Sequence, residues 1–363
     1  MQKQYVYFNE KYERKAERII FVDGICPGAL TSKDIELSHW MPNKTPLKYK
    51  KDTSTEICFS FLKEKGEEGF GQVSSNHFDT DGLLAAFTLL YPAVALKHRE
   101  LLERVSHMGD FGAWQEREFS IFYEVLASLR KRWKNEGLNS EQSFFKGFEA
   151  LPYLVENYLE IDSENANQSF NFLEQQRSKI ESNEIKRIEI HPRLTVYRWS
   201  YDKAINLGLD PFYSVGFDSG LNTTTMLPNQ LRNYFDRERL CLIVIEHQNG
   251  FFYDLLLPEY LWAETSTLWI PSGIVNEGKT NLFRWECQTE DSTKTNLKRM
   301  CDNLNSKDAG LGKWVLCHEF NAFKTIPGKK FPVFMSYLKN DQAAPSKLSP
   351  ENVIENLVSI EFV

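Results

Sequence analysis

The chain has 363 residues, of which 42% are hydrophobic and 13% aromatic, so it can bury two hydrophobic cores or one core with a large added layer. Its net charge of −7 at pH 7 argues against broad binding to duplex nucleic acid, which needs a basic surface. The charge leaves room for a small phosphorylated substrate that is held through a metal ion.

The first half of the sequence predicts a mixture of strands and helices. Residues 18–23 are an apolar run that ends at Asp23, which is typical of a buried strand. The stretch that follows, residues 24–46, predicts a long loop, and loops of this length in a compact domain are usually functional. Two further strands are predicted at residues 55–62 and 70–75.

Apolar residues at helical spacing dominate the next hundred residues. Pro92 separates the first two predicted helices, and two glycines bound a predicted turn at residues 106–112. The helices are predicted at residues 82–90, 93–106, 114–133, 141–159 and 169–182.

From about residue 184 short β-rich runs alternate with turns. Asn249-Gly250 lies between two apolar runs and predicts a β-hairpin. A Ser-Pro-Glu start predicts a helix from Ser349, and residues 358–363 predict a last strand. We therefore expect an α/β N-terminal domain at residues 1–183 and a β-rich α+β domain at residues 184–363.

The six cysteines include no Cys-x-x-Cys pair, which argues against a zinc ribbon. Several lie in apolar runs, where a free thiol behaves as a small hydrophobic group. The N-terminus lacks the apolar core of a signal peptide, and no apolar run approaches the roughly 20 residues that span a bilayer. We expect a soluble cytoplasmic protein that does not bind membranes.

The stretch with the most candidate metal ligands is residues 76–82, Asn-His-Phe-Asp-Thr-Asp-Gly, between a predicted strand and a predicted helix. His77, Asp79 and Asp81 are alternate residues, so their side chains can face one site. One imidazole and two carboxylates suit Mn²⁺ or Mg²⁺ and, less specifically, Zn²⁺. The helix that begins here offers unpaired N–H groups to an anion, so the stretch suits metal-assisted hydrolysis of a phosphoester.

A structural interpretation of the same residues stays open. Asp79 or Asp81 can cap the following helix with help from Thr80, and His77 can be an ordinary hydrogen-bonded residue. The sequence alone does not decide between capping and metal binding.

His77-Phe78-Asp79-Thr80-Asp81-Gly82 resembles the first motif of the DHH phosphoesterase superfamily, which carries HxDxDG at a strand-to-helix junction. The resemblance implies a DHH-like sheet with flanking helices in the N-terminal domain. It also implies that His77, Asp79 and Asp81 bind Mn²⁺ or Mg²⁺, which activates water against a phosphoester or phosphoanhydride. A later motif of that superfamily has an Asp ligand in a turn after a helix, which implies Asp110 as a fourth ligand.

The chain departs from the superfamily because it lacks the Asp-His-His triplet and the glycine-rich substrate motif. His107, three residues before Asp110, and His39 are therefore candidates to complete the metal site or to act as proton donors. A helix C-terminus explains His107 on structural grounds, and local hydrogen bonding explains His39. Asp23 and the acidic residues of 52–56 are further candidate ligands, although turn and cap chemistry explains them about as well.

A second resemblance extends over more of the chain. Residues 37–46 (LSHWMPNKTP) and 52–56 (DTSTE), together with NHFDTDG, resemble a family of bacterial proteins of unknown function. That resemblance implies no activity.

The sequence thus supports a divalent-metal-dependent hydrolase that acts on a small phosphorylated substrate. The alternative is a non-enzymatic ligand- or partner-binding protein on a degenerate phosphoesterase-like scaffold. A nuclease for single strands is a third hypothesis, against which the acidic charge counts. The absence of GxSxG, P-loop and GxGxxG motifs argues against serine hydrolases, P-loop NTPases and dinucleotide enzymes.

Overall fold

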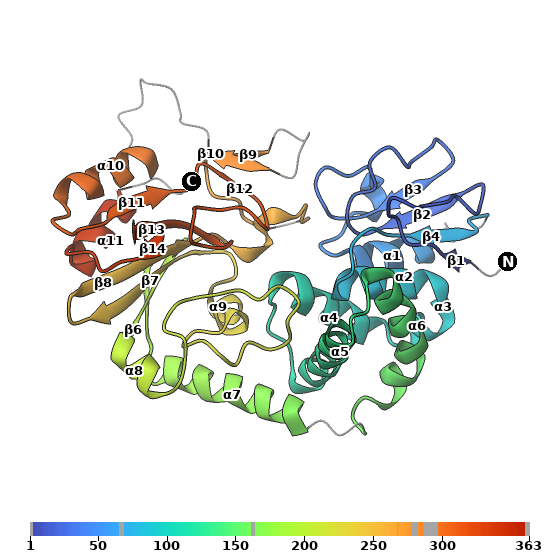
Figure 1. Cartoon of the computed structure of the whole chain (residues 1–363), viewed down its shortest axis with the longest axis horizontal. Coiled ribbons are helices and arrows are strands. Elements are labelled where there is room, and N and C mark those ends of the chain that lie inside the picture. The colour runs from blue at the N-terminus through green and yellow to red at the C-terminus, as the bar shows by residue number, and fades with distance from the viewer. Residues whose placement is uncertain are drawn as a thin grey trace. The chain divides into compact units, whose positions relative to one another are not determined.

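The computed structural model describes residues 3–64, 69–160, 164–266, 268–276, 282–285 and 297–359. It is a mixed α/β structure with several sheets, and it divides into two compact units (Figure 1). The first unit consists of Met1–Asn171 with two later segments, Gly216–Leu221 and Ala263–Thr267, and the second holds the rest. In the described part of the chain, every helix is too short or too polar to cross a membrane.

A four-stranded parallel sheet forms the centre of the first unit. Its spatial order is β1 (Gln4–Tyr5), β4 (Gln72–Ser74), β2 (Ile19–Val22) and β3 (Ile35–Leu37). All residues of β2 and β4 are buried, as expected for parallel strands that are covered on both faces. Because the strands are parallel, the carboxyl ends of β2, β3 and β4 meet at one edge of the sheet.

The two faces of this sheet are covered by different kinds of structure. Ile19 and Phe21 pack with Cys26 against side chains of the flanking loops, which are Phe8, Tyr12, Ala29 and Leu30. Helices cover the opposite face, where α2 (Thr80–Leu90) contacts β1, β2 and β4 (Figure 1).

Helix α2 is the most buried helix of the first unit, since its first ten residues are all buried. It packs against α1, α4 and α6, which shield it from solvent. The other helices of this region are α1 (Ser54–Lys63), α3 (Pro92–Lys97), α4 (Arg99–Phe111), α5 (Arg117–Asn135), α6 (Ser140–Asn157) and α7 (Glu164–Glu181), with a short 3₁₀ helix at Leu47–Tyr49.

The predicted strand at residues 55–62 is wrong, because these residues lie in helix α1. Thr53 is the N-cap, and its side chain and that of Glu56 form a capping box that fixes the start of the helix. This Thr-x-x-Glu signature decides for a helix, because the apolar residues of TEICFSFL suit either a strand or a helix and Ile57 and Phe61 lie on one helical face.

The predicted turn at residues 106–112 is also wrong. Helix α4 continues to Phe111 and ends at Gly112, which has the left-handed φ of 54° that favours glycine. Gly109 lies inside the helix, and glycine is needed there because a Cβ would come within 2.9 Å of Thr80 Cβ. The glycines therefore mark a close helix contact and a C-terminal cap, and Asp110 is a helical residue.

Two other predictions need correction in the same region. The predicted helix at residues 93–106 is two helices, α3 and α4, which are interrupted at His98. The predicted loop at residues 24–46 contains strand β3, which is parallel to β2. The predicted strands at residues 18–23 and 70–75 and the helix at 82–90 are confirmed, with bounds that differ by a few residues.

The second unit contains a seven-stranded sheet. Its order is β11-β13-β8-β7-β6-β5, with β14 paired to β13; β6 and β7 are parallel and the other neighbours antiparallel. The strands are β5 (Lys186–His191), β6 (Leu194–Ser200), β7 (Leu240–His247), β8 (Gly250–Leu256), β11 (Lys313–Leu316), β13 (Val333–Lys339) and β14 (Gln342–Ala343).

The predicted hairpin at Asn249-Gly250 is confirmed, since β7 and β8 are antiparallel and His247 pairs with Gly250. The predicted helix near the C-terminus is α11 (Pro350–Val358), whereas residues 360–363 of the predicted last strand lie outside the described residues. The remaining elements are α8 (Tyr201–Asn206), α9 (Asn229–Asp236), α10 (Leu297–Lys307), a 3₁₀ helix (Glu259–Trp262) and the sheet of β9 (Ile274–Asn276), β10 (Phe283–Trp285) and β12 (Glu319–Phe320).

Candidate metal centre

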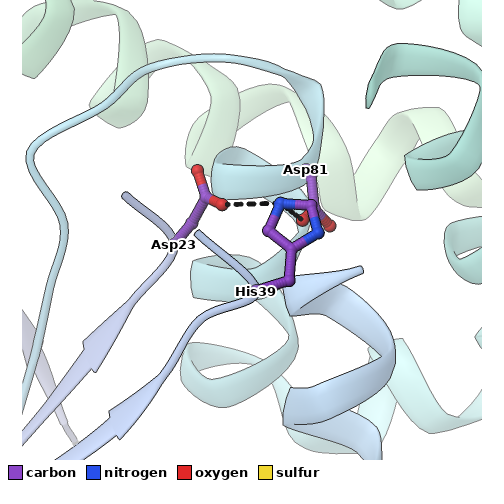
Figure 2. Close-up of side chains that lie close together, drawn as sticks. All are labelled: Asp23, His39 and Asp81. Carbon is purple, nitrogen blue, oxygen red and sulfur yellow. Dashed lines mark ion pairs between the residues drawn. The ribbon is translucent and has the colours of Figure 1, made fainter. Parts of the chain in front are cut away.

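Three side chains of the first unit converge where its parallel strands end. Asp23 follows β2, His39 follows β3, and Asp81 lies in the first turn of α2, after β4. Nε2 of His39 lies 3.6 Å from Oδ1 of Asp23 and 3.8 Å from Oδ2 of Asp81, and all three side chains are fully buried. Figure 2 shows the imidazole directed at both carboxylates. One ligand atom from each residue lies within 4.8 Å of the others, so the three side chains are close enough together to hold one metal ion.

Helix α4 brings a third carboxylate to the same imidazole. Oδ2 of Asp110 lies 3.1 Å from Nε2 of His39, and only 3% of the Asp110 side chain is exposed. Of the six residues that the sequence singles out, the structure thus brings together His39, Asp81 and Asp110. Asp23 joins them.

The other ring nitrogen of His39 determines the tautomer. Nδ1 lies 2.5 Å from the backbone carbonyl oxygen of Asp52, and a carbonyl oxygen can only accept a hydrogen bond. Nδ1 therefore carries a proton. In a neutral imidazole Nε2 then presents its lone pair to the carboxylates, which is the arrangement of a metal-binding histidine held by a backbone carbonyl.

Asp23 has an unusual backbone conformation for a residue with a side chain. Its φ is 49°, in the left-handed region where Asp is one of the better tolerated residues. Oδ1 accepts a hydrogen bond from Oγ of Ser54 at 3.0 Å, while Oδ2 has no hydrogen-bond partner in the described structure. A Cβ on Gly82 would lie 2.9 Å from Oδ2, so glycine at 82 makes room for this carboxylate.

Asp81 stabilises helix α1 and not its own helix. Its two carboxylate oxygens accept the backbone N–H groups of Ser54 at 2.7 Å and Thr55 at 2.9 Å, at the N-terminus of α1. These bonds fix the orientation of the carboxylate. Each oxygen retains a second lone pair that can bind a cation.

Asp79 is the N-cap of α2. This is the capping role that the sequence offers for Asp79 or Asp81 as the alternative to metal binding. Oδ1 accepts the N–H of Gly82 at 2.7 Å, and Oδ2 lies 2.8 Å from Nε2 of His77. The His77 side chain is 38% exposed, and its ring centroid lies 4.9 Å from that of Trp40. His77 and Asp79 therefore pair with each other beside the buried group, with His77 in contact with solvent.

His107 is directed elsewhere. Its Nε2 lies 3.0 Å from Oε2 of Glu56, the residue that completes the capping box of α1. Its ring also packs near Phe111, whose centroid lies 5.8 Å away and is equally far from that of His39. The structure thus gives His107 a partner that stabilises the start of α1, and Phe111 is a shared neighbour of both imidazoles.

The electrostatics of the centre are those of crowded acids. Burial raises the pKa of Asp23 and of Asp110 well above the usual range, and the charges of Asp79 and Asp81 add to both shifts. Burial also raises the pKa of Asp81, against the opposing effect of His39. For His77, burial lowers the pKa, but the charge and hydrogen bond of Asp79 outweigh this and raise it to about 10. These carboxylates need either protons or a cation.

A divalent cation fits the residues that are present. Oδ2 of Asp23 and Oδ2 of Asp110 are buried oxygens without a hydrogen-bond partner in the described part of the chain. Carboxylate oxygens with one imidazole nitrogen form a donor set that suits Mn²⁺, Mg²⁺ or Zn²⁺. His39, Asp23 and Asp81 are each oriented by a hydrogen bond to a neighbouring backbone group or hydroxyl. Metal ligands in proteins are usually held by such hydrogen bonds.

The fold and this buried group define a mixed α/β protein with a candidate Asp/His metal site. Residues 1–198 match a family of unknown function, DUF6687, and the chain belongs to this family. None of the curated proteins and none of the solved structures matches the chain. The matched range contains all four residues of the candidate site.

Sequence reasoning gave Asp23 too little weight, and it did not single out Asp218 or Arg130, which contact Thr80. Asp23 had a usable signal, since it ends a buried strand just as the 76–82 stretch follows one. Asp218 had none, because it lies far from the motif in the sequence and reaches it only in the folded chain.

Proposed function

We propose that this chain is a divalent-metal-dependent hydrolase of a phosphoester or phosphoanhydride, with Mn²⁺ or Mg²⁺ held by Asp23, His39, Asp81 and Asp110. The observation that carries the proposal is the approach of Nε2 of His39 to three buried carboxylates, 3.1 Å from Asp110 and 3.6 Å from Asp23. A cation bound there would supply Lewis acidity toward a phosphoryl oxygen and would lower the pKa of a water molecule.

The chain's own residues would hold the ligands in fixed orientations. The carbonyl of Asp52 sets the tautomer of His39, and the start of α1 orients Asp23 through the Ser54 hydroxyl. Two N–H groups of α1 orient Asp81. Such preorganisation lets the ligands bind a cation with little rearrangement.

His77 is the residue of this loop that is best placed to meet a substrate. Its side chain is 38% exposed and is held by Asp79 and by the ring of Trp40. We assign it contact with a substrate oxygen, for which an imidazole held by a carboxylate is a suitable hydrogen-bond donor.

The phosphoester class rests on the resemblance of residues 77–82 to the first motif of the DHH superfamily. In this chain that motif follows β4, after Asp23 at the end of β2 and His39 at the end of β3. We infer that Asp23 and His39 replace the missing Asp-His-His triplet.

The test combines metal binding with hydrolysis. The purified chain, stripped with a chelator and reloaded with Mn²⁺, is assayed on bis-p-nitrophenyl phosphate and on pyrophosphate. Asp23→Asn and Asp110→Asn are each expected to lower turnover by at least about 100-fold and to weaken Mn²⁺ binding. Asp236→Asn, which alters a buried carboxylate of the second unit, is the matched control. Undiminished hydrolysis in both site variants would overturn the proposal.

One observation favours a second function, a non-enzymatic binding protein on a degenerate scaffold. Asp79 caps α2 and Asp81 accepts two N–H groups of α1, so both acids have structural roles without any metal. This alternative predicts no stoichiometric Mn²⁺ binding by the wild-type chain. It also predicts that Asp79→Ala and Asp81→Ala lower the melting temperature alone, by the usual effect of losing a side chain that accepts N–H groups at a helix N-terminus.

A further inference from the structure

A segment from the second half of the sequence reaches the loop that carries the candidate ligands. Gly216–Leu221 belongs to the first unit, although Val215 before it and Asn222 after it belong to the second. Its backbone is anchored on α5, where the N–H of Leu221 donates to Oε2 of Glu124 at 2.7 Å. Gly220 has a φ of 91°, and a Cβ there would come within 2.5 Å of Oε2 of Glu124. The close approach of this segment to α5 thus depends on glycine.

The side chain of Asp218 in this segment binds Thr80 twice. Oδ2 accepts the backbone N–H of Thr80 at 3.0 Å, and Oδ1 accepts its hydroxyl. Thr80 stands between Asp79 and Asp81, and its N–H is the first of α2, which has no partner within the helix. Asp218 therefore fixes the backbone that connects the N-cap Asp79 to the candidate ligand Asp81.

Arg130 on α5 completes this contact. Its Nη1 pairs with the carboxylate of Asp218 and donates to Oγ1 of Thr80 at 3.0 Å and to the carbonyl of Asp218 at 3.1 Å. Only 13% of the Arg130 side chain and 8% of the Asp218 side chain are exposed. The guanidinium also lies 5.2 Å from the ring centroid of Phe78, which anchors the other side of the loop.

Helix α4, which carries Asp110, packs against Thr80 and Asp218 through Gly109. A Cβ on Gly109 would lie 2.9 Å from Thr80 Cβ and 3.3 Å from Oδ1 of Asp218. Asp218 is thus close enough to the candidate ligands to influence them.

We propose that Asp218 is a positioning residue of the metal centre, acting through Thr80 to hold Asp81 and the start of α2 in the geometry that binds a cation. This inference rests on the proposed metal site. The segment lies beyond residues 1–198, so the site depends on a part of the chain outside the range that matches the family. The second half of the sequence thereby contributes to metal affinity without supplying a ligand.

The test measures Mn²⁺ affinity by titration calorimetry, together with the melting temperature of the metal-free chain. Asp218→Ala and Thr80→Val are each expected to weaken Mn²⁺ binding by about tenfold or more. The double variant is expected to bind little more weakly than Asp218→Ala, because Asp218→Ala already removes the hydroxyl bond that Thr80→Val breaks, while Thr80→Val keeps the backbone N–H bond to Asp218. Thr80→Ser keeps the hydroxyl and is expected to bind like the wild type.

Asp236→Asn is the control for the general effect of altering a buried aspartate that pairs with an arginine, because Asp236 pairs with Arg187 in the second unit. It is expected to lower the melting temperature and to leave Mn²⁺ affinity unchanged. If Asp218→Ala does not fold, Thr80→Val and Thr80→Ser carry the comparison. Wild-type affinity in Asp218→Ala or Thr80→Val overturns this inference alone, whereas a wild-type chain that binds no Mn²⁺ overturns the metal site and this inference with it.

Discussion

Nε2 of His39 and Oδ2 of Asp110 lie 3.1 Å apart in a site where both side chains are almost fully buried. Because the Nδ1 proton of His39 is directed at the carbonyl of Asp52, a neutral imidazole turns its lone pair toward the carboxylate. Two acceptors at this distance require a proton or a cation between them. Metal binding therefore depends first on the His39–Asp110 pair, and His77 and Asp79 of the 76–82 stretch lie beside it.

Mn²⁺ is therefore expected to stabilise the wild-type chain, and His39→Gln is expected to remove most of that stabilisation. A ligand present at 100 times its Kd adds about 2.7 kcal/mol to the unfolding free energy, provided that it binds only the folded chain. The measurement is the melting temperature with and without Mn²⁺, with Ca²⁺ as a comparison ion. An equal Mn²⁺ shift in His39→Gln would exclude this imidazole as a ligand.

Gly82→Ala is expected to disturb the site by steric conflict alone. The added Cβ would lie 2.9 Å from Oδ2 of Asp23 and 3.2 Å from Oδ1 of Asp79, inside helix α2, where alanine is otherwise favoured. We expect a loss of about 1–3 kcal/mol in unfolding free energy, as for other overpacked interiors. Urea titration measures it, and a neutral or stabilising effect would mean that these carboxylates lie farther from Gly82.

Gly28→Ala is a useful comparison for that experiment. Its φ is 74°, and a Cβ there would meet nothing within 4 Å. Its effect should come only from the strained backbone, at roughly 1 kcal/mol, and Mn²⁺ binding should be unchanged. Gly82→Ala should alter both quantities.

The local part of the site was predictable from the sequence, and the assembled part was not. The strand, loop and helix around His77 and Asp79 follow from short-range periodicity and a capping residue. That His39 meets Asp110 depends on the parallel pairing of β2 with β3 and on the continuation of α4 through Gly109. Neither of these follows from spacing along the chain.

Helix α1, which the sequence predicts as a strand, also shows how far local patterns can predict the site. Residues 55–62 are rich in apolar and aromatic side chains, which suits a buried strand, yet Thr53 and Glu56 cap a helix there. The error mattered for the site, because the N-terminus of α1 supplies the N–H groups that orient Asp81. A strand in that place would have left Asp81 without its partners.

In the second unit, the stability contributed by Asp236 is expected to depend on pH. Burial disfavours the charged carboxylate, but hydrogen bonds from Arg187, Tyr197 and Thr195 outweigh burial and hold the pKa of Asp236 below its ordinary value. A lowered folded-state pKa gives stability that is present above the unfolded pKa, about 3.9, and is lost as the pH falls through the folded value.

Asp236→Asn should therefore destabilise the chain most at neutral pH, by about 3–5 kcal/mol if the buried pair is broken. The difference between the wild type and the variant should shrink below about pH 4. Chemical unfolding at several pH values measures it. A difference that does not change with pH would show that the variant loses packing and not a charge interaction.

His77→Gln is expected to separate substrate contact from metal binding. His77 is held by Asp79 at 2.8 Å, and its side chain is 38% exposed, whereas His39 is fully buried among the carboxylates. If His77 contacts a substrate oxygen, its loss should lower kcat/KM for the Mn²⁺-loaded chain by roughly 10- to 1,000-fold, the range for one hydrogen-bond donor in an active site.

The Mn²⁺ affinity of His77→Gln should stay within about threefold of the wild type. Residues that do not bind the metal themselves usually change its affinity only when they orient one of its ligands. His98→Gln, which alters the imidazole paired with Glu156, is the matched control and should leave kcat/KM unchanged. A variant that loses Mn²⁺ affinity together with its activity would instead make His77 a metal ligand, as the motif resemblance implies.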